Sequence, residues 1–152
     1  MNDKSQSQES SPRKAPVIPA DMKAFNAKLI EDFRANHGQF SGDMAGRSIL
    51  ILTTTGVRSG EPRPVVLGYG RHGDQLVVIA SNNGAPKAPA WYHNLLAHPT
   101  ATIELAGPER FEVRATMARP EERDELAKAL PYLGQQQSLT EREIPIVVFK
   151  RV

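Results

Sequence analysis

The sequence predicts a mostly β fold with flanking helices (α+β), in which antiparallel strands form a barrel. Six short runs are rich in β-branched and apolar residues and end at Gly, Pro, Asp or Asn: residues 48–54, 63–69, 75–80, 100–105, 110–117 and 144–149. The connections at 70–74 and 106–109 are short enough for hairpins, so neighbouring strands should run antiparallel. No run is followed by Gly-x-Gly-x-x-Gly, and such connections do not accommodate the helices of a doubly wound sheet.

Before the first strand, a polar segment is followed by a helix signal. Residues 1–20 are rich in Ser, Gln and Pro, so we expect a disordered tail, with residues 21–152 forming one domain. Asp21 can cap a helix that Gly38 would end, and apolar residues recur in it at three- and four-residue steps: Met22, Phe25, Leu29 and Phe33. This helix should cover the sheet, and a loop over 39–47 should follow.

Two further helices should interrupt the strands. Residues 89–97 begin with a helix-compatible proline and place Trp91 and Leu95 on one side. Residues 120–130 have acidic residues in the first turn, which the helix dipole favours, and carry Leu126 and Leu130 on one face. Between them, the run 110–117 alternates so that one set of side chains can face inward: Phe111, Val113, Ala115 and Met117.

Composition excludes several classes of protein. The chain has 152 residues, enough for one core, and no cysteine, which rules out disulfide scaffolds, thiolate metal sites and cysteine nucleophiles. The formal net charge is +2, which suits an anionic small molecule, and no basic cluster with interleaved aromatics favours nucleic acid. We expect no metal site, because the four histidines lack metal-ligand spacing. Without a membrane span or signal peptide, a cytoplasmic location is expected.

The first candidate site follows the first strand, where three threonines lead into a turn. Gly56 and Gly60 bracket Arg58 and Ser59, and Arg63 opens the next strand. Glycines at both ends of a short turn let backbone N–H groups converge on an anion, and two arginines add charge that matches phosphate geometry. An ordinary hairpin turn with solvated arginines explains this stretch equally well. A P-loop is excluded because the Gly-Lys-[Ser/Thr] ending is absent.

The second candidate site is the stretch 81–92. It follows an apolar strand, gathers small and turn-forming residues, and ends at the start of a helix, where free N–H groups can meet an anion or a carbonyl edge. Ser81 supplies a hydroxyl, Lys87 a charge, and Trp91 a stacking surface. The alternative is a surface loop in which Trp91 anchors the core.

Together the two stretches resemble a known family. The patterns L-T-T-T-G-x-[KR]-S-G-x-x-R and A-S-x-x-G-A-x-K-x-P-x-W-Y-x-N-L are similar to those of the deazaflavin-dependent nitroreductase and quinone reductase family of actinobacteria. The resemblance extends over about residues 25–148. It implies a split β-barrel, FMN-binding split-barrel-like, that binds reduced coenzyme F420. It also implies hydride transfer from F420 to a small-molecule acceptor: a quinone, a nitro compound or an activated alkene.

The resemblance also assigns residues. Arg58 and Arg63 match basic residues on the phosphate and acidic tail of the cofactor, and residues 81–87 match the segment against the deazaflavin ring. Asn82 stands where some relatives have lysine. The expected cofactor-binding set is Arg58, Ser59, Arg63, Ser81, Asn82, Asn83, Gly84, Ala85, Lys87, Pro89 and Trp91.

The substrate side differs from the family pattern. Nitroaromatic reductases of this family have several tyrosines there, whereas residues 130–137 contain one tyrosine, Tyr132, and three glutamines. We consider Ser81, as a hydrogen-bond donor to the acceptor oxygen, and Tyr132, as a proton donor, to be the candidate catalytic residues. Tyr132 could equally be a half-buried residue at the barrel edge.

Other functions and assembly states stay open at this point. The same barrel could bind FMN, which is less favoured because Arg58, Arg63 and Lys87 exceed what one phosphate needs. The chain could also be a non-catalytic deazaflavin carrier that lacks the substrate-side tyrosines. A monomer or a homodimer is compatible with the sequence, and a quinone acceptor would imply peripheral association with a membrane.

Overall fold

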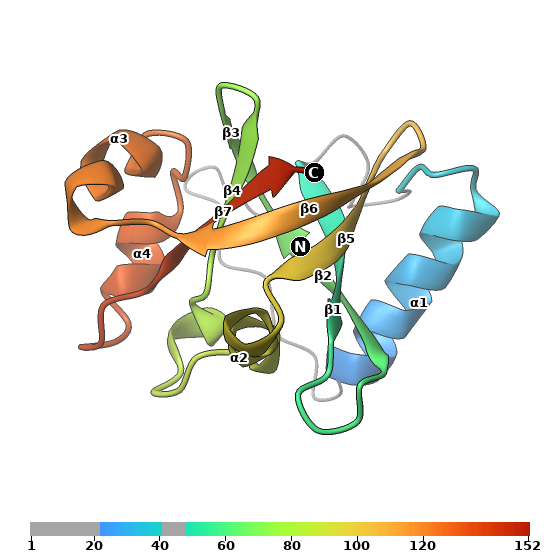
Figure 1. The fold of residues 1–152 in the computed structure, drawn as a ribbon, viewed down its shortest axis with the longest axis horizontal. Helices are drawn as coiled ribbons and strands as arrows, with labels where there is room; N and C mark the ends of the chain where they lie inside the picture. Colours follow the sequence, from blue (N-terminus) through green and yellow to red (C-terminus); the bar gives the residue numbers. More distant parts are fainter. Residues whose placement is uncertain (1–21, 41–47) are drawn as a thin grey trace, which may run out of the picture.

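Seven antiparallel strands form one curled sheet, a half-barrel with helices around it (Figure 1). The computed structural model describes residues 22–40 and 48–152. The strand order across the sheet is β2-β1-β5-β6-β7-β4-β3. The bounds are β1 Ile49–Thr55, β2 Pro62–Gly68, β3 Gly70–His72, β4 Gln75–Ile79, β5 Thr100–Leu105, β6 Glu109–Met117 and β7 Ile146–Arg151. The predicted mostly β split-barrel architecture is therefore confirmed, whereas the predicted tail at 1–20 lies outside the described residues.

One chain segment supplies both edges of the sheet. β2 and β3 lie at opposite ends of the strand order, yet only Tyr69 separates them in the sequence. Tyr69 donates its backbone N–H to the carbonyl of Ser48 at 3.0 Å, which fixes the bend. The sheet therefore curls until its two edges meet in a single bent strand, as a barrel requires. The stretch 70–74, predicted to be a hairpin turn, contributes β3 and leaves a two-residue turn at Gly73-Asp74, with Gly73 at φ +64°.

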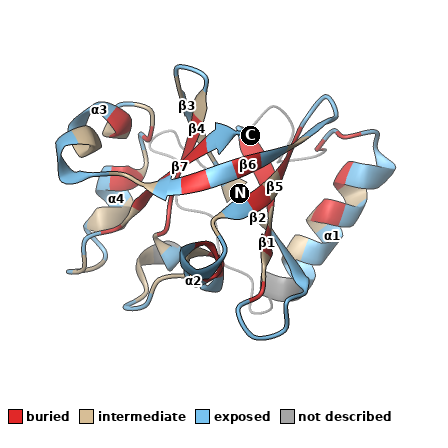
Figure 2. Cartoon of the chain, in the orientation of Figure 1, coloured by how far each residue is buried: buried red, intermediate tan, exposed pale blue. Residues whose placement is uncertain are grey.

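Strands β1 and β4 are buried on both faces, which explains why their sequences are continuous apolar runs (Figure 2). Leu50 and Leu52 of β1 point into the barrel core, where they join Trp91 and Phe149. The opposite face of β1 packs with the Phe33 and Phe40 region, and that of β4 packs with apolar residues after β6: Leu126, Leu130 and Leu133. The side chains that alternate inward on β6 occupy the predicted face, with Val113 and Ala115 buried.

Most of the helices cover these outer faces, whereas the helix that carries Trp91 and Leu95 packs into the barrel core. α1 spans Met22–Ala35, α2 spans Ala90–Ala97, α3 spans Arg123–Ala127 after a 3-10 turn at Pro120–Glu122, and α4 spans Leu133–Gln137. The apolar face predicted for α1 is partly wrong: Ile30 and Phe33 are buried, whereas Phe25 is 40% exposed. Asp21, the predicted cap, and most of the predicted loop 39–47 lie outside the described residues. The helix predicted over 120–130 is shorter than expected, and α4 was not predicted.

The end of α1 is attached to the barrel by backbone contacts. Gly38 donates its N–H to Phe33 at 2.8 Å and adopts φ +77°, which confirms the predicted left-handed cap, and His37 before it also has a positive φ of 57°. A Cβ on Gly38 would lie 2.1 Å from Cβ of Pro108, so only glycine permits the β5–β6 turn to approach. The Gly107 N–H bonds to the Gly38 carbonyl at 2.9 Å and completes the contact.

Candidate functional site

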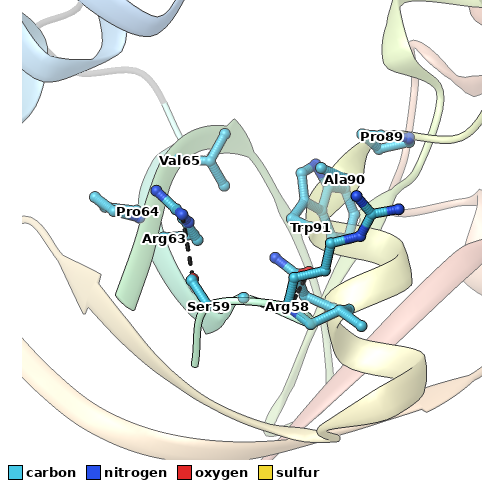
Figure 3. A pocket seen from close by; sticks show the side chains of 11 residues that line it. Arg58, Ser59, Arg63, Pro64, Val65, Pro89, Ala90 and Trp91 are labelled. Carbon is cyan, nitrogen blue, oxygen red and sulfur yellow. Dashed lines mark hydrogen bonds between the residues drawn. The ribbon is translucent and has the colours of Figure 1, made fainter. Parts of the chain in front are cut away.

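A pocket of about 470 Å³ opens between the β1–β2 loop and the start of α2 (Figure 3). It is lined by residues 56–59, 63–65 and 89–91 and by Asn94. The two candidate stretches thus meet at this pocket, although only the last part of the second stretch lines it. The volume is within the range of small-molecule and cofactor sites.

The β1–β2 loop is held in a tight arc by its own backbone. Gly56 donates its N–H to the carbonyl of Glu61 at 2.9 Å, and Gly60 donates to Gly56 at 3.0 Å. Gly60 has φ +72°, which favours glycine. Gly56 has an ordinary φ, but a Cβ there would lie 2.7 Å from Oγ of Ser59. Glycine is therefore favoured at position 60 by its backbone conformation, whereas a side chain at position 56 would displace the Ser59 hydroxyl.

Ser59 orients one of the two arginines. Its Oγ accepts hydrogen bonds from Nη2 of Arg63 at 3.2 Å and from the backbone N–H of Glu61 at 3.1 Å. With those two bonds accepted, the hydroxyl hydrogen of Ser59 is left to donate to a ligand. Figure 3 shows Arg63 on the β2 side of the pocket and Arg58 on the α2 side. Arg58 has no hydrogen-bond or ion-pair partner within residues 22–40 and 48–152.

The electrostatics of the pocket favour an anion. Arg58 and Arg63 line it and no carboxylate does. The backbone N–H groups of Arg58 and Ser59 meet no acceptor in the described part of the chain, so they too are available as donors. Fixed N–H groups and guanidinium forks around one concavity are an arrangement that binds phosphate and carboxylate groups.

Asn94 joins α2 to the loop, and this role was missed in the sequence. The side chain is buried, with 7% of the residue exposed. Its Nδ2 donates to Oγ1 of Thr54 at 3.0 Å, and its Oδ1 accepts the backbone N–H of Val57 at 3.2 Å. A buried asparagine in an apolar helix needs partners, so its position one turn after Trp91 was the available signal. Asn94 therefore fixes the distance between the helix and the arginine-bearing loop.

Trp91 and Pro89 form the apolar wall of the pocket. Pro89 precedes α2 with extended backbone angles, φ −69° and ψ 158°, and so starts the helix at the pocket edge. Trp91 is 7% exposed and packs into the barrel core, while it also lines the pocket. The two alternatives for Trp91, core anchor and pocket wall, are both true of this residue.

The loop that carries Ser81 to Lys87 lies outside the pocket lining. It contains a 3-10 turn, Asn82–Gly84, followed by Ala85, whose N–H bonds to the carbonyl of Asn82 at 3.0 Å. Asn82 has a positive φ of 48° and donates its Nδ2 to the carbonyl of Lys87 at 3.0 Å. The predicted residues Ser81, Asn82, Asn83, Gly84, Ala85 and Lys87 are thus together in one loop but apart from Arg58 and Arg63.

Tyr132 also lies away from the pocket. Its hydroxyl is buried without a hydrogen-bond partner in the described part of the chain, and its ring packs with the cluster around α3 and α4. The hydroxyl is near Gly68 at the end of β2, where an added Cβ would lie 3.6 Å from it. Burial raises the pKa of Tyr132 to about 12, so the group stays protonated at neutral pH.

The described residues show neither a metal site nor a membrane-spanning helix. They contain no group of three or more histidine or carboxylate side chains close enough to hold a metal ion. No helix within them is both long and apolar enough to span a lipid bilayer.

Comparison with known proteins places the chain in a family. Residues 27–151 match the family model described as F420H(2)-dependent quinone reductase. The chain belongs to this family. The resemblance to deazaflavin-dependent reductases is therefore confirmed, and with it the class of oxidoreductase that uses the reduced deazaflavin F420.

Relatives support the assignment over most of the chain. An F420H(2)-dependent quinone reductase of Mycobacterium tuberculosis H37Rv is 36% identical over 128 residues, which cover 78% of this chain and 85% of the relative. A second, putative F420H(2)-dependent quinone reductase of the same strain is 32% identical over 105 residues, covering 66% of this chain and 87% of the relative.

Solved structures agree with the fold. An F420-H2-dependent reductase aligns with a TM-score of 0.61 at 31% identity, covering 68% of this chain and 95% of that protein. A structure described as a domain-swapped dimer aligns with a TM-score of 0.64 at 29% identity, covering 82% and 93%. A heme-binding protein from Mycobacterium smegmatis, at 17% identity and a TM-score of 0.55, shares the fold alone; it covers 69% of this chain and 46% of that protein.

Proposed function

We propose that this chain transfers a hydride from reduced coenzyme F420 to a quinone, and that the pocket beside the β1–β2 loop holds the acidic part of the cofactor. The observation that carries the proposal is the pair Arg58 and Arg63 around a pocket that no carboxylate lines. Coenzyme F420 has a phosphate and a poly-glutamate tail, and free N–H groups and guanidinium forks fit both. The residues present therefore fit the cofactor.

The residues of the chain have separate tasks in this proposal. Ser59 holds Arg63 by a 3.2 Å hydrogen bond, and Asn94 holds the loop backbone at Val57, so the Arg63 guanidinium and the loop are oriented before the ligand arrives. Trp91 and Pro89 give the flat wall against which an aromatic ring can lie. When bound, the reduced deazaflavin supplies two electrons as a hydride, so the protein needs to position and stabilise rather than to supply a strong acid.

Ser81 is the proposed donor to the acceptor oxygen as negative charge develops on it. Tyr132 is the second proposed catalytic residue, but its hydroxyl is buried against the barrel and would have to leave this position to act. Solvent water can protonate the reduced acceptor without such a movement. The same chemistry would extend to nitro compounds and activated alkenes, which also accept a hydride.

The decisive experiment compares two cofactors and one acceptor. The purified protein is titrated with F420 and with FMN by ligand fluorescence, and reduced F420 is then oxidised with menadione in a single turnover. We expect micromolar binding of F420 alone, followed by oxidation. Binding without oxidation by menadione or other quinones would favour a deazaflavin carrier, and binding of FMN alone would show that the arginines recognise a single phosphate.

We further propose that the chain works in the cytoplasm as a monomer or homodimer and meets lipid-soluble quinones at the membrane surface. A related structure described as a domain-swapped dimer supports the dimer. Exposed Val57, on the loop that lines the pocket, and Leu96 give apolar contacts of the kind that interfacial binding uses. Sedimentation with quinone-containing vesicles, with lysozyme as a soluble reference, tests the membrane part. If the protein does not sediment with the vesicles, the proposed membrane association is contradicted.

A further inference from the structure

A single arginine holds the loop that connects β4 to α2. The guanidinium of Arg142 donates Nε to the carbonyl of Ala85 at 3.0 Å, and Nη2 to those of Ser81 at 2.7 Å and Ala80 at 3.2 Å. A longer contact of 3.5 Å reaches the carbonyl of Lys87. These acceptors extend over the whole loop, although Arg142 is more than fifty residues away in the sequence.

The backbone of Arg142 is itself fixed from α4. Gln137 donates Nε2 to the Arg142 carbonyl at 2.7 Å and accepts the N–H of Ile144 on Oε1 at 3.0 Å. Leu139 packs closely against Gly84. A Cβ added to Gly84 would lie 2.5 Å from the Cβ of Leu139. The segment 137–144, which we call the bracket, therefore contacts the loop through both a charged and an apolar side chain.

This arrangement determines which backbone groups the loop offers to a ligand. The carbonyls of Ala80, Ser81 and Ala85 are directed to Arg142, and that of Asn82 accepts the Ala85 N–H. In contrast, the N–H groups of Ser81, Asn82 and Lys87 have no acceptor in the described part of the chain. The carbonyls held by Arg142 and by the Ala85 N–H are thus turned to the protein, whereas these three N–H groups stay available as donors to a carbonyl edge or an oxyanion.

The charge of Arg142 adds to this effect. No carboxylate of the described residues lies within ion-pair distance of it, so its charge is balanced only by carbonyl dipoles. A half-buried positive charge behind the loop raises the potential that an anionic ligand group would meet in front of it.

We propose that Arg142 is a positioning residue of this enzyme: by gathering the loop carbonyls, it directs the free N–H groups of Ser81, Asn82 and Lys87 toward the cofactor and the acceptor oxygen. The ligand part of this inference rests on the proposed function. The structural part, the clamping of the loop by one guanidinium, does not.

The test compares Arg142→Lys and Arg142→Met with Arg123→Lys as a matched control. Arg123 also donates to a backbone carbonyl, that of Ile144 at 2.9 Å, but does not contact the loop. Lysine keeps the charge at position 142 but cannot reach the separate carbonyls at once. Far-UV circular dichroism establishes that each variant is folded.

The first readout needs no ligand. The amides of Gly84 and Ala85 are hydrogen-bonded inside the loop, so their hydrogen exchange by NMR reports its geometry. We expect Arg142→Lys to accelerate their exchange by about tenfold or more, while Val77 and Val78 of β4 stay within about twofold of the parent. Unchanged exchange at Gly84 and Ala85, or equal acceleration in Arg123→Lys, would overturn the clamp.

The second readout separates positioning from a purely structural role. Arg142→Lys should raise the dissociation constant for F420 by about tenfold and should also lower kcat with menadione, because the donors are displaced in both the bound and the transition state. Arg123→Lys should stay within about twofold in both. If Arg142→Lys accelerates amide exchange in the loop but leaves the dissociation constant for F420 and kcat at the values of the parent protein, the positioning role is overturned. If the parent protein itself fails to bind F420, the proposed function fails, and only the exchange result for the clamp stands.

Discussion

At the scale of single residues, Arg58 and Arg63 differ in how they are held. Arg63 is oriented by Ser59, whereas Arg58 has no partner among the described residues. A ligand anion therefore finds one prearranged guanidinium and one that must be immobilised on binding. Immobilising a long side chain reduces the net gain from the contact, so Arg63 should contribute at least as much to affinity as Arg58.

We predict that Arg58→Ala and Arg63→Ala each weaken F420 binding by about 1.5–3 kcal/mol, the usual size of a charge-assisted hydrogen bond. Fluorescence titration of the cofactor measures this. Arg114→Ala is the matched control, because Arg114 is exposed on β6 and outside the pocket lining. If both pocket variants bind F420 as tightly as the parent protein does, the pocket is not part of the cofactor site.

The Tyr132 hydroxyl is buried and has no hydrogen-bond partner among the described residues, so removal of the hydroxyl should be tolerated. We predict that Tyr132→Phe leaves the free energy of unfolding unchanged or raises it by up to about 1–3 kcal/mol, because a buried hydroxyl without a partner is lost. Turnover should change by less than about tenfold. Tyr92→Phe is the control. A larger loss of turnover at equal cofactor affinity would show that Tyr132 does act as a proton donor.

The same residue predicts an alkaline limit of stability. The unfolded chain loses the Tyr132 proton near its ordinary pKa of 10.0, whereas the folded protein keeps it until about pH 12. Between these values the folded state binds more protons, so stability falls as the pH rises through this window. The decline should be shallower in Tyr132→Phe when urea midpoints are compared at neutral pH and at about pH 11.

At the scale of elements, α2 and the β1–β2 loop behave as one unit because of Asn94. We predict that Asn94→Ala destabilises the protein by about 1–3 kcal/mol for each of the two groups it leaves unpaired, the Thr54 hydroxyl and the Val57 N–H. Affinity for F420 should fall as well, because the loop is released. Urea unfolding and titration measure the two effects. Asn36→Ala is the control, since the Asn36 amide is exposed and makes only a 3.5 Å contact.

Elements held by tertiary contacts were the ones that the sequence pattern described poorly. α1 buries Ile30 and Phe33 rather than Phe25 because the barrel surface at Ile49 and Ile51 selects which turns it contacts. α4 is too short to be stable alone. It forms where the Gln137 side chain bonds to the backbone of Arg142 and where Leu133 packs with Leu126 and Leu130.

At the scale of the whole molecule, the bent segment 62–72 joins both edges of the sheet, and Trp91 packs in the core that the strands enclose. We predict that the loss of Trp91 fluorescence and the loss of far-UV circular dichroism coincide in urea, because no part of the barrel is closed without the rest. Trp91 is the sole tryptophan of the chain, so the signal is unambiguous. Two protein concentrations serve as the control, since a shift of the midpoint between them would reveal a dimer. An earlier fluorescence transition would show that α2 unfolds on its own.

The fold class, every strand except β3 and the glycine-bracketed loop with its arginines could be predicted from the sequence, because these features depend on local rules. Alternating side chains specify strands, and glycine permits tight turns. The sequence also carried the family motifs, since those are stretches of consecutive residues.

The contacts that those segments make depend instead on how the chain packs in three dimensions. This packing placed Arg58, Arg63 and Trp91 around one pocket, left Ser81 and Lys87 in a neighbouring loop, and turned the Tyr132 hydroxyl into the barrel edge. It also revealed the roles of Asn94 and Arg142. Those roles are hydrogen bonds between residues far apart in the chain, and neither composition nor periodicity encodes such contacts, because they exist only once the strands have paired and the barrel has closed.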